Sequence, residues 1–222
     1  MTATPRRHAP LVPLPPYSFV PGHGLPHPVT DPAGHLYGLE PVTPLAAAEL
    51  ATLPVDSVGR REAITALLAE SPHWLHAIDL FNAGFYWEAH EAWEGFWHVL
   101  GRTTPEARLV QGMIRLAAAC VKIREGSLEG VKRHTLRARE LLGDAVAADR
   151  GSGASRAAAL GLSCTSIASL LRELEACRPE CWHTSRAAVV RVLTSDLRLA
   201  GTDDPATDDP GADDPVDADG AG

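Results

Sequence analysis

The segment that decides the fold is residues 81–98, which read FNAGFYWEAHEAWEGFWH. It holds seven of the twelve aromatic residues in the chain. At about 100° per residue, the apolar side chains that follow Gly84 gather on one broad face. This pattern predicts an amphipathic helix over residues 85–100 whose apolar face enters the core.

Signals for helix starts and stops extend this pattern in both directions. Ser71-Pro72 and Thr104-Pro105 each place a capping side chain before a proline, which is tolerated in the first turn of a helix. Glycines then stop successive helices. The strong signals predict helices over 72–83, 85–100, 105–124 and 128–142, and weaker patterns predict helices near 57–70, 163–177 and 184–198.

The chain carries a faint internal repeat. Gly84 and Gly126 lie 42 residues apart, and at each a helix ends and another begins at once. The β-branched alternation typical of strands is missing throughout. We therefore predict an all-α fold, a compact bundle of stacked αα-hairpins similar to tetratricopeptide arrays, because two repeats are too few for a solenoid. The predicted helical domain spans residues 45–200, with its core motif over 72–142.

The two ends of the chain differ from this domain. Residues 1–44 are rich in proline, which disfavours helix for each preceding residue and predicts an extended arm. Its apolar side chains, such as Leu11, Tyr17 and Tyr37, favour an arm that packs on the domain. Residues 201–222 contain DDP three times and eight aspartates without a base, which predicts a disordered acidic tail.

Charge and composition exclude some classes of function. The formal net charge is −8, but the eight aspartates of the tail account for all of it, so the rest of the chain is balanced. A balanced domain argues against a nucleic-acid partner. No apolar run is long enough to span a membrane, and no secretory signal is apparent, so we predict a cytoplasmic protein without a membrane partner. The four cysteines are then expected to be free thiols.

His90, Glu91 and Glu94 carry the strongest chemical signal. His90 and Glu94 are one turn apart on one edge of the predicted helix, and Glu91 lies beside them. An imidazole and carboxylates in this arrangement suit a metal site or an acid–base pair. The pattern is H-E-x-x-E, which differs from the H-E-x-x-H of zinc proteases. We hypothesise that these three residues are catalytic; the alternative is a half-buried His–Glu pair with a structural role.

The arm offers two further metal ligands. If the arm folds back, His27 and His35 would join His90 and Glu94 in a His/carboxylate cluster that suits zinc, manganese or iron. The alternative is a turn-rich strap whose imidazoles cap backbone groups.

Ligand-binding candidates flank the same helix edge. We expect Gln111 and Arg115 to face Glu91 or Glu94 across the interface between two helices. The full set of binding candidates is Trp87, Glu88, Trp93, Trp97, Gln111 and Arg115.

Three motifs resemble a known family. F-N-x-G-x-Y/F-W-E-A-H-E-x-W-E-x-x-W fits residues 81–97, L-x-Q-G-x-I fits 109–114, and G-x-x-x-G fits 126–130. Together they resemble the DUF309 family of bacterial and archaeal proteins over roughly residues 14–142. In the fuller form of the third motif, G-N-x-x-G-A, this chain has Ser127 in place of asparagine and Val131 in place of alanine. The resemblance implies a small all-helical fold and brings no established activity.

Three functional interpretations remain open from the sequence. The first is a helical bundle that binds a small molecule or peptide, with or without a divalent metal. The second is a metal-dependent hydrolase in which a metal-bound water is the nucleophile and Glu91 or Glu94 is the base. The third is an interaction module, with a second copy of the chain among its candidate partners, in which the His/Glu network is purely structural.

Overall fold

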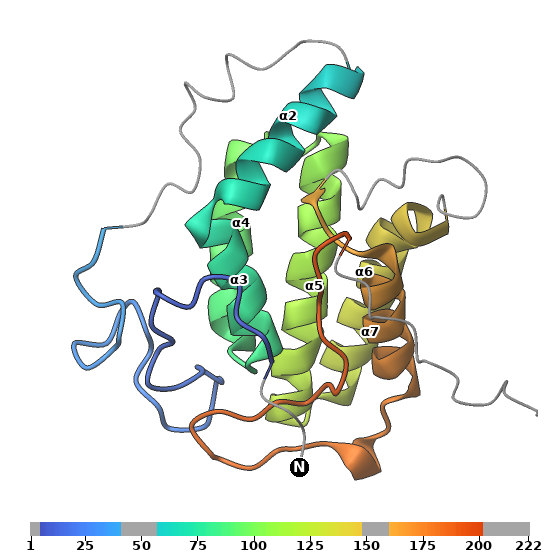
Figure 1. Cartoon of the computed structure of the whole chain (residues 1–222). Helices are drawn as coiled ribbons and strands as arrows, with labels where there is room; N and C mark the ends of the chain where they lie inside the picture. The colour runs from blue at the N-terminus through green and yellow to red at the C-terminus, as the bar shows by residue number, and fades with distance from the viewer. Residues whose placement is uncertain (1–4, 41–56, 148–159, 202–222) are drawn as a thin grey trace, which may run out of the picture.

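The computed structural model describes residues 5–40, 57–147 and 160–201. Within these ranges the regular structure is helical, apart from one isolated bridge between Leu162 and Leu199. This confirms the predicted all-α fold. The helices are α2 (Ser57–Glu70), α3 (Pro72–Asn82), α4 (Tyr86–Val99), α5 (Pro105–Glu125), α6 (Leu128–Ala147) and α7 (Cys164–Ala176), followed by a 3-10 turn over Pro179–Cys181 (Figure 1).

The predicted caps set the helix boundaries. The Ser71 side chain accepts a hydrogen bond from the backbone N–H of Trp74 at 3.3 Å, which caps α3. Thr104 caps α5 in the same way, with the N–H of Ala107 at 3.2 Å. Gly126 ends α5 in the left-handed conformation, at φ 73°, which glycine adopts at little cost.

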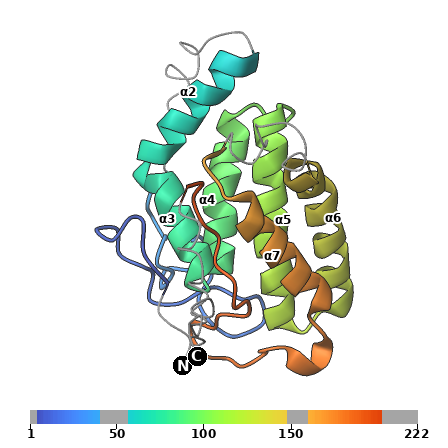
Figure 2. The same ribbon diagram turned by 45° about the vertical axis from the view of Figure 1, so that its right-hand side comes forward.

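Helix α5 is the centre of the bundle. It lies between α4 and α6, while α3 packs on the outer side of α4 and α7 packs on α6 (Figures 1 and 2). Because α5 is apolar on nearly every side, residues such as Met113 and Ala117 are completely buried. Gly112 allows α6 to approach closely, since a Cβ atom there would lie 2.5 Å from Leu142 Cγ. Helix α2 packs on α3 and projects beyond the end of the bundle (Figure 2).

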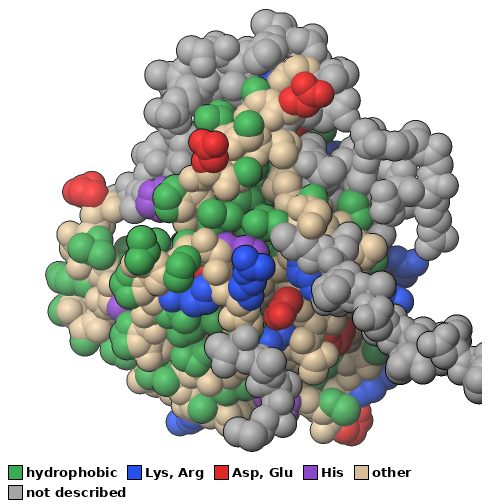
Figure 3. Space-filling model, in the orientation of Figure 1, with side chains coloured by type: hydrophobic (Ala, Val, Ile, Leu, Met, Phe, Trp, Pro, Cys, Tyr) green, Lys and Arg blue, Asp and Glu red, His purple; other side chains and the backbone are tan. Residues whose placement is uncertain are grey.

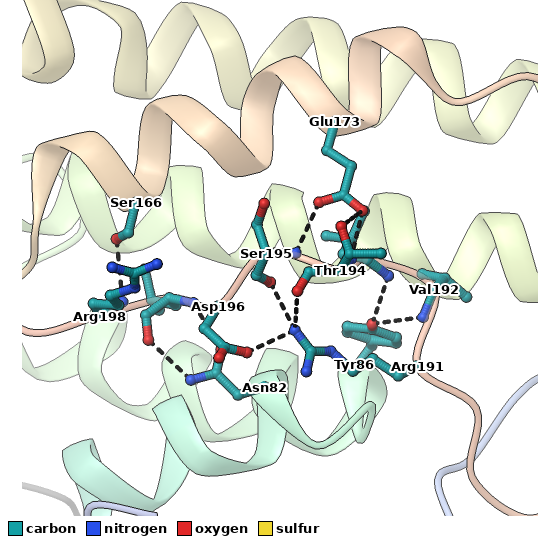
Figure 4. Close-up of polar contacts among 12 residues, drawn as sticks. Asn82, Tyr86, Ser166, Glu173, Arg191, Val192, Thr194, Ser195, Asp196 and Arg198 are labelled. Atoms are coloured by element: carbon teal, nitrogen blue, oxygen red, sulfur yellow. Dashed lines mark hydrogen bonds and ion pairs between the residues drawn. The ribbon is translucent and has the colours of Figure 1, made fainter. Parts of the chain in front are cut away.

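The helix predicted near residues 184–198 is wrong. This part of the chain belongs to the C-terminal segment (residues 182–201), which has no helix and runs along the bundle past α5 (Figure 1). Side chains of the bundle satisfy its backbone groups (Figure 4). Asn82 donates to the carbonyl of Leu197 at 2.9 Å and accepts from its N–H at 2.8 Å. Arg124 donates to the carbonyls of Ser185 and Ala187, both at 3.0 Å.

Two buried carboxylates hold the arm, here residues 5–40, against the bundle. Asp79 accepts hydrogen bonds from the backbone N–H groups of His8 at 2.7 Å and Ala9 at 2.8 Å. Glu88 accepts from the N–H of Phe19 at 2.8 Å. Packing of the arm on the helices therefore depends on acceptors that α3 and α4 supply from their buried faces.

The arm buries only part of its apolar surface. Tyr17 is buried as expected, whereas Leu11 is 95% exposed and Tyr37 is 52% exposed. Hydrophobic side chains accordingly gather over the arm, at the left of Figure 3. The expectation that Leu11 and Tyr37 pack on the domain is wrong, because the arm is anchored instead by hydrogen bonds from its backbone to Asp79 and Glu88.

Some sequence predictions fall outside the described residues. These are the acidic tail beyond residue 201 and the end of the arm at residues 41–44. The four cysteines form no disulfide with one another, as expected, and Cys120 is buried whereas Cys181 is exposed. None of the described helices combines the length and apolar character that a membrane crossing requires.

Candidate functional site

His90, Glu91 and Glu94 lie together on helix α4. One ring nitrogen and one oxygen from each carboxylate all fall within 4.8 Å of one another. His90 Nε2 is 3.3 Å from Glu94 Oε1. The helix itself creates this cluster, because residues three and four positions apart share a face.

The ligand atoms are close enough together to be candidates for one metal ion, but they are not at coordination spacing. Zinc–nitrogen and zinc–oxygen bonds are about 2.0–2.2 Å long, so two ligand atoms on a tetrahedral ion are about 3.4 Å apart. The atoms of the cluster lie within 4.8 Å of one another, so the side chains must move closer together to bind one ion. The Glu94 side chain, 41% of which is accessible, is partly free to do so.

The protonation of the cluster favours ligand binding. Burial lowers the pKa of His90, although Glu94 opposes this effect. Neutral imidazole, the form that binds metals, is therefore the stable form at neutral pH. Partial desolvation, and then the negative charge of Glu94, raise the pKa of Glu91. A bound cation would relieve the repulsion between the two carboxylates.

The three tryptophans of α4 have different surroundings. Trp93 is fully buried against Phe81, with ring centroids 5.5 Å apart, and belongs to the core. Trp97 is partly exposed, and its indole N–H donates to the carbonyl of Arg102 at 3.1 Å. Trp87 is also partly buried, and the arm covers it.

The arm places its histidines beside Trp87 and Glu88. The His27 ring contacts Trp87 edge-on at 5.5 Å, and His35 Nε2 is 3.7 Å from Glu88 Oε1. The structure therefore does not bring His27 and His35 to His90 and Glu94. Within residues 5–40, 57–147 and 160–201, the only group of three or more His, Cys, Asp or Glu side chains with metal-ligand spacing is the one on α4.

Arg115 does not form the expected contact with Glu91 or Glu94. Among the described residues, neither Arg115 nor Gln111 makes an ion pair or hydrogen bond with these carboxylates. The Arg115 side chain instead lines a pocket with residues of α6, including Arg133 and His134. The sequence reasoning missed these α6 residues, although the dense run VKRHTLRARE at 131–140 is the signal that marks them.

The fold and the cluster define an all-helical bundle with one candidate metal site. Residues 74–134 match the model of the DUF309 family, a domain of unknown function. This match confirms the resemblance to the DUF309 family that the sequence motifs indicate. The match runs from α3 into α6 and includes His90, Glu91 and Glu94. Neither the comparison with curated proteins nor that with solved structures gave a match.

Proposed function

We propose that this DUF309 bundle is a ligand-binding protein whose site contains a divalent metal held by His90, Glu91 and Glu94. The observation that carries the proposal is the convergence of one imidazole and two carboxylates to within 4.8 Å on a single helix face. A nitrogen donor with two oxygen donors suits zinc, manganese or iron.

A metal-dependent hydrolase is the second candidate. Ligands from a single helix lie on one side of an ion and leave its other positions open, as in catalytic rather than structural sites. If His90 and Glu94 hold the ion, the more exposed Glu91 can take the proton of a metal-bound water. The raised pKa of Glu91 suits such a base, because it lies nearer to neutral pH.

Metal retention tests the proposed site. The purified protein is stripped with EDTA, reloaded separately with zinc, manganese or iron, desalted and subjected to elemental analysis. We expect about one equivalent of one of these metals in the wild type and a loss of at least tenfold in a His90→Gln/Glu94→Gln variant. Circular dichroism establishes that the variant is folded.

A matched control removes the same two residue types elsewhere. His73 is exposed on α3, and the Glu129 side chain is 87% exposed on α6. A His73→Gln/Glu129→Gln variant should retain as much metal as the wild type. A folded wild type that retains none of the three metals contradicts the proposal and favours a structural His/Glu network.

A further inference from the structure

A second feature, a pocket between α5 and α6, lies outside the candidate metal site. Its volume is about 370 Å³, which is within the usual range for small-molecule sites. The lining residues are Arg115, Arg133, His134, Leu136, Arg137 and Glu140. Three of the six are arginines, so the pocket is strongly basic in a chain whose body is balanced in charge.

The three guanidinium groups of the pocket differ in their partners. Arg137 is paired with Glu140 at 2.7 Å, so these two charges balance. Arg115 and Arg133 make no ion pair with any residue that the structure describes. Among the described residues the pocket therefore carries about two uncompensated positive charges, one on each helix.

Two buried polar atoms of the pocket have no hydrogen-bond partner among the described residues. They are Nδ1 of His134, a residue that is 9% exposed, and Nε of Arg115. Buried polar atoms are almost always hydrogen-bonded, so each exception needs an explanation. The guanidinium N–H is a donor, and the imidazole becomes a second donor when its proton is on Nδ1, which points to a ligand rich in acceptor oxygens.

The pocket lies where the central helix α5 meets α6, and α5 also packs on α4, the helix that carries the candidate metal site. Burial, followed by the charges of Arg115 and Arg133, lowers the pKa of His134 to about 4. The positive charges that surround this imidazole therefore keep it neutral at physiological pH.

We infer that this pocket binds the phosphate group of a small phosphorylated molecule, between Arg115 and Arg133. The inference goes beyond the proposed function, because the pocket contains none of the candidate metal ligands. A phosphate monoester carries close to two negative charges at neutral pH, which matches the two unpaired guanidinium groups, and arginine binds phosphate through paired hydrogen bonds. Leu136 offers apolar surface to the organic part of the ligand.

Isothermal titration calorimetry with phenyl phosphate tests the inference. The titration is done in buffer with EDTA, so that a failure of the phosphate pocket is separate from a failure of the metal site. We expect saturable binding by the wild type and affinity at least about tenfold lower in each of Arg115→Gln and Arg133→Gln. Arg133 is exposed, so its variant should fold normally. Arg172, exposed on α7 and outside the pocket, gives the control variant Arg172→Gln, which should bind like the wild type.

Three outcomes would overturn the inference. The first is a wild type that does not bind phenyl phosphate. The second is unchanged affinity in the folded Arg115→Gln and Arg133→Gln variants. The third is equal affinity for inorganic phosphate and phenyl phosphate, which would assign the pocket to the free ion.

Discussion

The hydroxyl of Tyr86 accepts a hydrogen bond from the backbone N–H of Val192 at 2.9 Å, across 106 residues of sequence. The N–H of Leu193 approaches the same oxygen at 3.4 Å. Tyr86 opens helix α4, the helix that carries the candidate metal site. The C-terminal segment is thus tied directly to that helix, and burial of the hydroxyl raises its pKa, so it stays neutral.

Tyr86→Phe should destabilise the protein by about 1–3 kcal/mol, because it leaves two N–H groups of the C-terminal segment without an acceptor. Urea denaturation measures the loss. The control is Tyr37→Phe, at a residue that is 52% exposed, where a change within about 0.5 kcal/mol is expected. Equal free energies of unfolding for both variants would show that the Tyr86 hydroxyl is not an anchor.

Gly84→Ala should cost more stability than Gly101→Ala. Both glycines have positive φ, 91° and 88°, so each substitution carries the left-handed penalty of about 1–2 kcal/mol. At Gly84 the added Cβ would also lie 2.9 Å from the carbonyl oxygen of Val190, whereas at Gly101 the nearest atom is 3.6 Å away. Thermal unfolding of the two variants separates the backbone penalty from the clash, and equal losses would contradict the packing of the C-terminal segment on Gly84.

Glu88 should make the stability depend on pH. Burial raises its pKa from 4.5 to about 7. The folded protein therefore holds this proton more tightly than the unfolded chain does. The stabilisation that protonated Glu88 contributes to the folded state is largest below pH 4.5 and is lost as the pH rises to about 7. This pKa difference corresponds to a change of roughly 3 kcal/mol in the free energy of unfolding over that pH range.

Glu88→Gln tests this pH dependence, since an amide can still accept from the N–H of Phe19 but does not titrate. Urea denaturation across this pH range should give a flatter profile for the variant than for the wild type. A Glu129→Gln variant, changed at an exposed carboxylate, should follow the wild type. Parallel profiles for wild type and Glu88→Gln would mean that Glu88 ionises normally in the folded state.

The helices from α3 to α6 could be predicted because their signals are local. A cap such as Ser71 or Thr104, a following proline and a terminal glycine fix a helix boundary within a few residues of sequence. The α4 cluster is local in the same sense, since the spacing of His90, Glu91 and Glu94 is enough to bring them to one face.

The features that sequence reasoning missed depend on distant partners. Residues 184–198 contain apolar residues at spacings compatible with a helix, but Asn82 and Arg124 satisfy the backbone in an extended path. The same applies to the arm, where Glu88 holds Phe19, and to the pocket, where His134 meets Arg115 from a different helix. Buried polar residues on otherwise apolar helix faces are the signal that such partners exist.

The most direct test of the central claim is anomalous X-ray diffraction from crystals soaked in zinc, recorded at the zinc absorption edge. The account predicts an anomalous peak on α4 within about 2.0–2.2 Å of one nitrogen of His90 and of carboxylate oxygens of Glu91 and Glu94. Crystals that show no peak at these residues, or only peaks elsewhere on the molecule, would contradict it.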